Sequence, residues 1–240
     1  MKKFSPYVHY LAAFAGVAAA LLRQWLLVVG PDRKGLYPAA HPGWIGYLVV
    51  VVLAIAALFL LTRSDQTPTR PFAPAAFSIF GQAGAACGIG LLCLPLLQGS
   101  RMELICALVG FAAAIGLLVL SWQQFQQRTV FAPAYLLPAV FFALQVFLMG
   151  RAHSTETQML CFLPQFLACA ATGLASYEMM GLVMGIGNQR KGRFLRLCAA
   201  ALCFAATPGA HWMYAVVGLW QLLGPAIVAA PIAPAEAQSE

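Results

Sequence analysis

Several ionisable residues are concentrated in one short segment, residues 30–43, which reads Gly-Pro-Asp-Arg-Lys-Gly-Leu-Tyr-Pro-Ala-Ala-His-Pro-Gly. It brings Asp32, Lys34 and His41 together, and Arg23 precedes it by one to two helical turns. Such a mixture of cations, a carboxylate and an imidazole could capture an anionic or zwitterionic solute. The alternative is a turn rich in proline and glycine whose charges stay in water and pair weakly, and this alternative is favoured.

Other charged residues are expected on the same side of the protein as this loop, and together they would form a polar rim. The candidate ligand-binding residues of this rim are Arg23, Asp32, Lys34, His41, Arg101, Glu103 and Arg151. Glu178 is a separate candidate, because an ionisable residue within an apolar span is costly there and suggests a function. We expect Glu178 to lie one to two turns from the end of its span with a polar or basic partner such as Arg190 or Lys191. Structural and functional roles for Glu178 are equally supported.

No catalytic set assembles from the sequence. Ser176 and His211 could form a serine nucleophile and its base, but their spans place them toward opposite sides of the protein, too far apart for a hydrogen bond. The two aspartates, Asp32 and Asp65, also fall on opposite sides. There is no HExxH, GxSxG or CxxC motif and no zinc-like Cys/His spacing, so we predict no catalytic residue, metal or cofactor. The seven cysteines are expected to be small, buried, apolar side chains.

The composition indicates an integral membrane protein. Of the 240 residues, 62% are hydrophobic and 9% are charged, whereas a soluble domain has about 45–50% apolar and about 25% charged residues. The long apolar runs do not alternate with polar residues, so they predict helices rather than barrel strands. The net charge of +7 comes from basic residues between these runs. They are expected to orient the protein in the lipid bilayer, and we predict no binding of nucleic acid.

The apolar runs predict an all-α integral membrane protein, a bundle of about eight transmembrane helices arranged as hairpins. Residues 1–230 would form one helical domain, and residues 231–240 a disordered tail. An alternative with seven spans makes the break at Pro208 a kink. The predicted spans are Tyr7–Val29, Trp44–Leu61, Ala76–Leu97, Met102–Trp122, Ala134–Met149, Met159–Ile186, Phe194–Ala206 and Trp212–Ala230.

The distribution of Lys and Arg predicts the orientation of the bundle. With eight spans, nine of the 14 basic residues fall on one side, namely Lys2, Lys3, Arg63, Arg70, Arg128, Arg190, Lys191, Arg193 and Arg196. The other five, Arg23, Arg33, Lys34, Arg101 and Arg151, fall on the opposite side. We therefore expect a multi-pass protein of the cell membrane, most naturally a bacterial cytoplasmic membrane, with both termini in the cytoplasm.

Two kinds of sequence pattern suggest how the helices are arranged. Phe4, Phe72 and Phe131 each begin a Phe-x-Pro pattern shortly after a basic residue, which suggests a repeated helical hairpin with copies related by rotation about the membrane normal. Separate helix starts explain the pattern equally simply. Small residues at four-residue spacing predict close helix contacts in three places, Ala12-x-x-x-Gly16-x-x-x-Ala20, Gly84-x-x-x-Gly88 and Gly181-x-x-x-Gly185.

Every loop is too short to form a catalytic or recognition domain, so the function must lie in the helical bundle, on its rim or in a complex with a partner. Three functions remain open. The first is a small permease or membrane substrate-binding component. It needs polar residues that converge inside the bundle, for which the candidates are Gln82, Gln145, Gln165, Glu178 and Gln221. The second is an assembly or scaffold protein that binds a membrane protein partner through helix contacts. The third, ranked last, is a membrane enzyme of an unrecognised kind.

Overall fold

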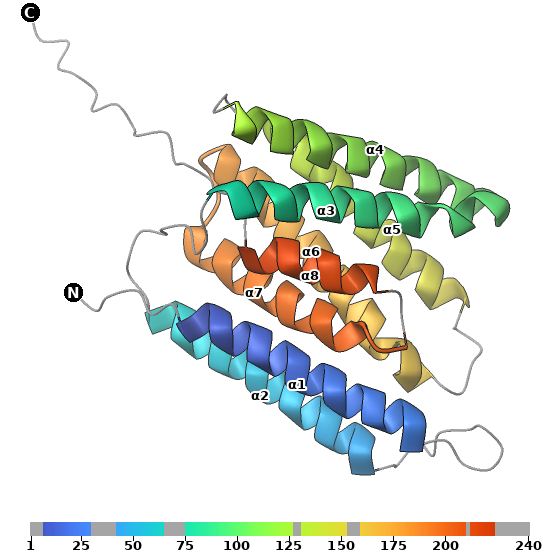
Figure 1. The fold of residues 1–240 in the computed structure, drawn as a ribbon, viewed down its shortest axis with the longest axis vertical. Coiled ribbons are helices and arrows are strands. Elements are labelled where there is room, and N and C mark those ends of the chain that lie inside the picture. Colours follow the sequence, from blue (N-terminus) through green and yellow to red (C-terminus); the bar gives the residue numbers. More distant parts are fainter. Residues whose placement is uncertain are drawn as a thin grey trace, which may run out of the picture.

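The computed structural model describes residues 7–29, 42–64, 75–126, 131–152, 159–209 and 212–223. These residues form eight α-helices and two short 3-10 helices, with no β-strand among them (Figure 1). The predicted tail and the polar loop at residues 30–41 lie outside the described residues. The helices are α1 (Tyr7–Val29), α2 (Pro42–Ser64), α3 (Ala75–Cys93), η1 (Pro95–Gln98), α4 (Arg101–Phe125), η2 (Ala132–Tyr135), α5 (Leu136–Ala152), α6 (Met159–Val183), α7 (Gln189–Ala206) and α8 (Met213–Leu223).

The predicted number of eight helices is confirmed in the described residues, and each predicted span overlaps one helix. Six of them, α1 to α6, form segments long and apolar enough to cross a membrane. α7 starts with several charged residues, and the described part of α8 is short. α7 ends at Ala206, and α8 returns along it as the second arm of a hairpin. The alternative of one kinked helix is therefore wrong.

The last hairpin lies between the first hairpin and the rest of the bundle. Consecutive helices pair as α1–α2, α3–α4, α5–α6 and α7–α8. α1 and α2 contact α7, and α1 also contacts α8, but neither helix contacts any of α3 to α6 in the described residues. On the other side, α8 packs against α3 and α7 packs against α6 (Figure 1). The predicted hairpin repeat is consistent with the two helices between Phe72 and Phe131, but rotational symmetry stays a prediction.

Small residues let the central helices approach closely, as two of the three motifs predict. A Cβ atom added at Gly16 would lie 2.9 Å from the Ala201 carbonyl oxygen, so α1 packs almost backbone to backbone on α7. Gly84 and Gly88 face Val216 and Met213 of α8. Because glycine has no side chain, these positions allow the last hairpin to pack closely against both of its neighbours.

The third small-residue motif is a helix end and not a contact between helices. Gly185 follows the end of α6 with a φ of 76°, a conformation that glycine adopts without steric cost. The amide of Gly185 donates to the Leu182 carbonyl at 3.2 Å, and the amide of Ile186 donates to the Gly181 carbonyl at 3.0 Å. This pattern is a Schellman motif, which satisfies carbonyl groups left over at the end of a helix. The predicted contact at Gly181 and Gly185 is therefore wrong.

Of the six cysteines whose side chains the structure describes, all but one follow the prediction. Cys93, Cys106, Cys169, Cys198 and Cys203 are buried free thiols, as expected for small apolar side chains. Cys87 is exposed on α3, so the prediction is wrong at that position.

Candidate functional site

The structure does not bring the described residues of the predicted rim together. Arg23 is buried, with only 1% of its surface exposed, whereas Arg101 and Arg151 are exposed at the ends of α4 and α5. α1, which carries Arg23, contacts neither α4 nor α5 in the described residues. The other rim candidates, Asp32, Lys34 and His41, lie outside the described residues. Arg23 therefore lies inside the bundle, whereas Arg101 and Arg151 lie on its surface.

Arg23 instead caps the end of α7. Its Nη1 donates to the carbonyl oxygen of Ala206 at 2.8 Å and to that of Ala205 at 3.4 Å. The last carbonyl groups of a helix have no partner within the helix and carry a partial negative charge, so a buried guanidinium there is favourable in both respects. Nearby, the Gln165 amide donates to the Gly209 carbonyl at 3.4 Å. These contacts give Arg23 a structural role.

Glu103 and Glu178 also have structural partners. Glu103 accepts a hydrogen bond from the Ser100 amide and completes a capping box at the start of α4. The Glu178 carboxylate forms an ion pair with the Lys191 ammonium group at the start of α7. Glu178 lies between one and two turns before α6 ends at Val183, so the predicted position and basic partner are confirmed.

The geometry of Ser176 fits a structural role within α6. Its hydroxyl group donates to the Thr172 carbonyl one turn earlier, at 2.8 Å, and the side chain is fully buried. The suggested base, His211, lies outside the described residues. A serine that hydrogen-bonds to its own helix is a common arrangement in apolar surroundings and requires no reaction.

A second group of polar residues converges at the end of the bundle where α7 begins. We call it the amide cluster, and it consists of Gln82, Gln124, Tyr135, Arg196 and Gln221 from α3, α4, η2, α7 and α8 respectively. The Gln124 amide donates to the Tyr135 hydroxyl at 3.2 Å, and Gln82 lies beside the same hydroxyl. Arg196 donates through Nη2 to the backbone carbonyl oxygen of Gln221 at 3.2 Å and lies near Tyr135.

Many polar atoms of the amide cluster have no hydrogen-bond partner, although they are enclosed by protein. Although the Tyr135 hydroxyl lies beside Gln82, neither amide atom of Gln82 has a partner at hydrogen-bonding geometry, and this residue has 0% of its surface exposed. The same holds for Gln221 Nε2, Gln124 Oε1 and Arg196 Nε. An unsatisfied buried polar group costs about 1–3 kcal/mol. Water or a bound polar molecule that hydrogen-bonds to these atoms would remove this cost.

The surroundings of the amide cluster are positively charged. Arg193, which also lies on α7, is within electrostatic range of Arg196. Within the described residues no carboxylate forms an ion pair with Arg196, and Glu178 is engaged by Lys191. The cluster therefore combines one partly enclosed guanidinium with several unused amide groups.

Sequence reasoning identified part of this cluster. Gln82 and Gln221 were predicted as polar residues that converge inside the bundle, and they do. Gln165 lies at the opposite end of α7, near Gly209, and Gln145 lies on α5 outside the cluster. Arg196 was counted only as a charge at the membrane surface, although its place about two turns into α7 is a signal that could have identified it.

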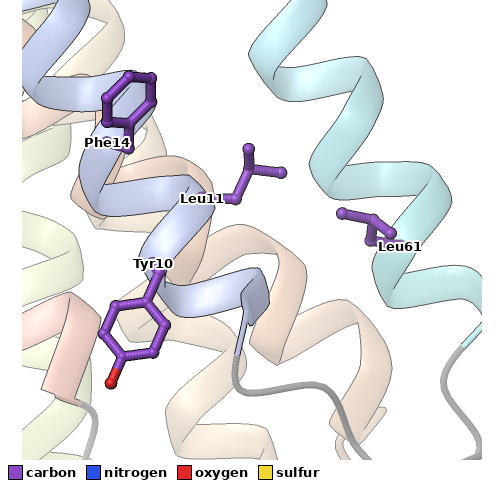
Figure 2. Close-up of a pocket in the computed structure, with 4 residues that line it drawn as sticks. All are labelled: Tyr10, Leu11, Phe14 and Leu61. Atoms are coloured by element: carbon purple, nitrogen blue, oxygen red, sulfur yellow. The ribbon is translucent and has the colours of Figure 1, made fainter.

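An open groove between α1 and α2 has a different character. Tyr10, Leu11 and Phe14 of α1 and Leu61 of α2 line it. Figure 2 shows Leu11 and Leu61 pointing toward each other across the gap. The groove presents almost only hydrocarbon, so it lacks the polar groups that would orient a solute. The amide cluster is the better candidate site.

Comparisons were made with protein-family models, with curated proteins and with solved structures, and none of the three gave a match to this chain.

Proposed function

We propose that this protein is a small permease or membrane substrate-binding component, which binds a small polar solute at the amide cluster. The observation that carries the proposal is the convergence of Gln82, Gln124, Tyr135, Arg196 and Gln221 from five separate elements of an otherwise apolar bundle. Sites for small molecules are typically apolar cavities with a few convergent polar groups. In membrane proteins such groups are rare and commonly mark a solute pathway.

The outer surface of the bundle supports a location in the membrane. Large apolar side chains are exposed along several helices, and they include Phe14 at 73%, Leu53 at 63%, Phe80 at 74% and Ile115 at 62%. In water such a surface would favour aggregation, whereas lipid tails solvate it without cost. The six apolar helices are long enough for the hydrocarbon layer.

We propose that the amide cluster lies toward the cytoplasm. Its end of the bundle carries five described basic residues, Arg63, Arg190, Lys191, Arg193 and Arg196, whereas the opposite end carries Arg23, Arg101 and Arg151. Short loops rich in Lys and Arg remain in the cytoplasm. Alkaline phosphatase fused after Gln127 should therefore be inactive, and the same enzyme fused after Ser154 should be active. The opposite pattern would reverse the orientation.

The test of function is a ligand screen on the purified protein. Thermal unfolding in neutral-lipid nanodiscs is measured with a panel of small metabolites, because a ligand that binds only the folded state raises the unfolding temperature in a saturable way. The stabilisation should disappear in a double variant, Gln82→Leu with Gln221→Leu, which removes two cluster amides. It should persist in Gln98→Leu, which alters an exposed amide on η1 at the opposite end of the bundle.

Two results would count against the proposal. One is a panel without any saturable ligand, and the other is a ligand whose effect survives the double variant. If no solute binds and one membrane protein purifies reproducibly with the chain, the assembly role becomes the better hypothesis.

A further inference from the structure

The start of α7 carries more positive charge than a helix start favours. Arg190, Lys191, Arg193 and Arg196 fall within its first two to three turns. The partial positive charge at a helix N-terminus repels cations, so helix stability does not explain this arrangement. Arg190 and Lys191 are exposed, as expected for charges at a membrane surface. Arg196 is different, because its Nε atom is enclosed by protein.

The unused groups around Arg196 are mainly hydrogen-bond donors. Arg196 Nε, Gln82 Nε2 and Gln221 Nε2 all lack an acceptor. Gln82 has 0% and Gln221 has 2% of its surface exposed. Among the described residues the carboxylate closest in sequence to α7, that of Glu178, is already paired with Lys191. A molecule that satisfied these donors would need to supply acceptor oxygens and a negative charge.

We propose that the amide cluster binds a small oxyanion, a carboxylate or a phosphate group, with Arg196 as its charged ligand. This inference rests on the proposed function and names the substrate class of the same site. A guanidinium offers its donors in a planar fork that matches the oxygens of these anions. The two glutamine amides add neutral donors, which a water-poor site needs to complete the anion's hydrogen bonds. Gln124 Oε1 can accept a hydrogen bond from a hydroxyl group or a protonated oxygen of the ligand.

The experiment measures thermal unfolding in nanodiscs of neutral phosphatidylcholine during titration with inorganic phosphate, succinate, glycerol and putrescine. We expect phosphate or succinate to stabilise the wild-type protein saturably, and the neutral and cationic compounds to have no effect. Arg196→Gln should weaken the oxyanion response about 10- to 100-fold, as expected for loss of a charge-assisted hydrogen bond. Arg190→Gln is the matched control on the same helix and should respond like the wild type.

The oxyanion can come from a free solute or from a lipid headgroup, and a second set of nanodiscs separates the two. Phosphatidylglycerol replaces part of the neutral lipid. If it stabilises the wild type and Arg190→Gln but not Arg196→Gln, the bound oxyanion is a headgroup. If only soluble anions act in this way, the oxyanion is a solute. Arg196→Lys keeps the positive charge but lacks the planar donors of the guanidinium group, so it should bind oxyanions more weakly than the wild type. This variant provides the test if Arg196→Gln does not fold.

Failure of the oxyanion inference and failure of the proposed function give different results. If glycerol or another neutral metabolite binds, and Gln82→Leu abolishes its effect while Arg196→Gln does not, the oxyanion inference is overturned and the proposed function stands. If no compound and no lipid changes the unfolding of the wild-type protein, both are overturned.

Discussion

The two ends of α7 both hold an arginine, but the surroundings of the two arginines differ. At the C-terminal end, Arg23 of α1 is buried and donates to the carbonyl oxygens of Ala205 and Ala206. At the N-terminal end, Arg196 donates to one backbone carbonyl, and amide atoms of the glutamines beside it have no hydrogen-bond partner. The difference shows that burial of a charge in a helical bundle does not by itself indicate function. The neighbouring polar groups that remain without a partner are the more informative property.

The helix dipole strengthens this contrast. The negative end of α7 stabilises Arg23, whereas the start of α7 offers Arg196 no such stabilisation. A partly enclosed cation that has no paired carboxylate among the described residues would be unfavourable in an empty site. Four experiments with variants test whether the two ends differ in this way, and they are ordered here by the size of the expected effect.

The largest effect is expected for Arg23→Gln. It removes the two hydrogen bonds from a charged donor to the end of α7 and leaves buried carbonyl groups without a partner. The free energy of unfolding, measured by titration with sodium dodecyl sulfate in mixed micelles, should fall by about 3 kcal/mol. Arg101→Gln, which alters an exposed arginine, should change it by less than about 0.5 kcal/mol. Equal effects of the two variants would contradict the capping role of Arg23.

Two glycines near the two ends give a matched pair. Gly209 has a φ of 72°, and a Cβ there would meet Leu27 Cδ1 at 2.7 Å, so Gly209→Ala should lower the free energy of unfolding by about 1–2 kcal/mol. In Gly192→Ala the new Cβ meets only the flexible end of Leu182 at comparable distance. The gain in helix propensity, about 1 kcal/mol, should compensate for that contact. A larger loss of free energy of unfolding in Gly192→Ala than in Gly209→Ala would show that the start of α7 is more closely packed than its end.

Gln82→Leu should stabilise the unliganded protein while it abolishes the response to ligand. The variant replaces an enclosed amide that has no partner with an apolar side chain of similar size. The expected gain in free energy of unfolding is about 1 kcal/mol. The same measurement on Gln98→Leu, at an exposed position, should show no such gain. A loss of stability in Gln82→Leu would indicate that its amide is satisfied in the folded protein and serves structure.

The smallest effect is expected for the ion pair between Glu178 and Lys191. The Lys191 side chain is 61% exposed, so water screens the pair. A double-mutant cycle with Glu178→Gln and Lys191→Met should give a coupling energy below about 1 kcal/mol, and high salt should reduce it. A coupling of several kcal/mol would mean that the pair is shielded from water and helps to fix α6 against α7.

Much of the fold followed from the sequence because long apolar runs require helices in lipid. The first span was predicted as Tyr7–Val29, which are the bounds of α1. α2 extends beyond its predicted span to Pro42 and Ser64, because a helix continues through polar residues where the apolar run has ended. Which helices pack against one another could not be predicted. A helix that is apolar on all sides has no stripe that identifies the face it buries.

The candidate site was predictable only in part. Gln82 and Gln221 were identified because an amide within an apolar span stands out, and Glu178 was placed correctly with a basic partner. Arg23 was expected on the exposed rim and is buried in the structure, since its position near the end of a span resembles that of a surface charge. Arg196 was overlooked for the same reason. In both cases the deciding contacts come from helices distant in the sequence, and spacing along the chain carries no information about them.

The place of α7 and α8 between the first hairpin and the others has a consequence for biogenesis. The ribosome delivers α1 and α2 first and α7 and α8 last, yet α1 and α2 contact only these last helices in the described bundle. In a bilayer, the first hairpin would therefore have no docking partner until synthesis is almost complete. We therefore expect that residues 1–64 and residues 65–240 can be produced as two separate polypeptides. When they are co-expressed, the two fragments should associate in the membrane and form the complete bundle.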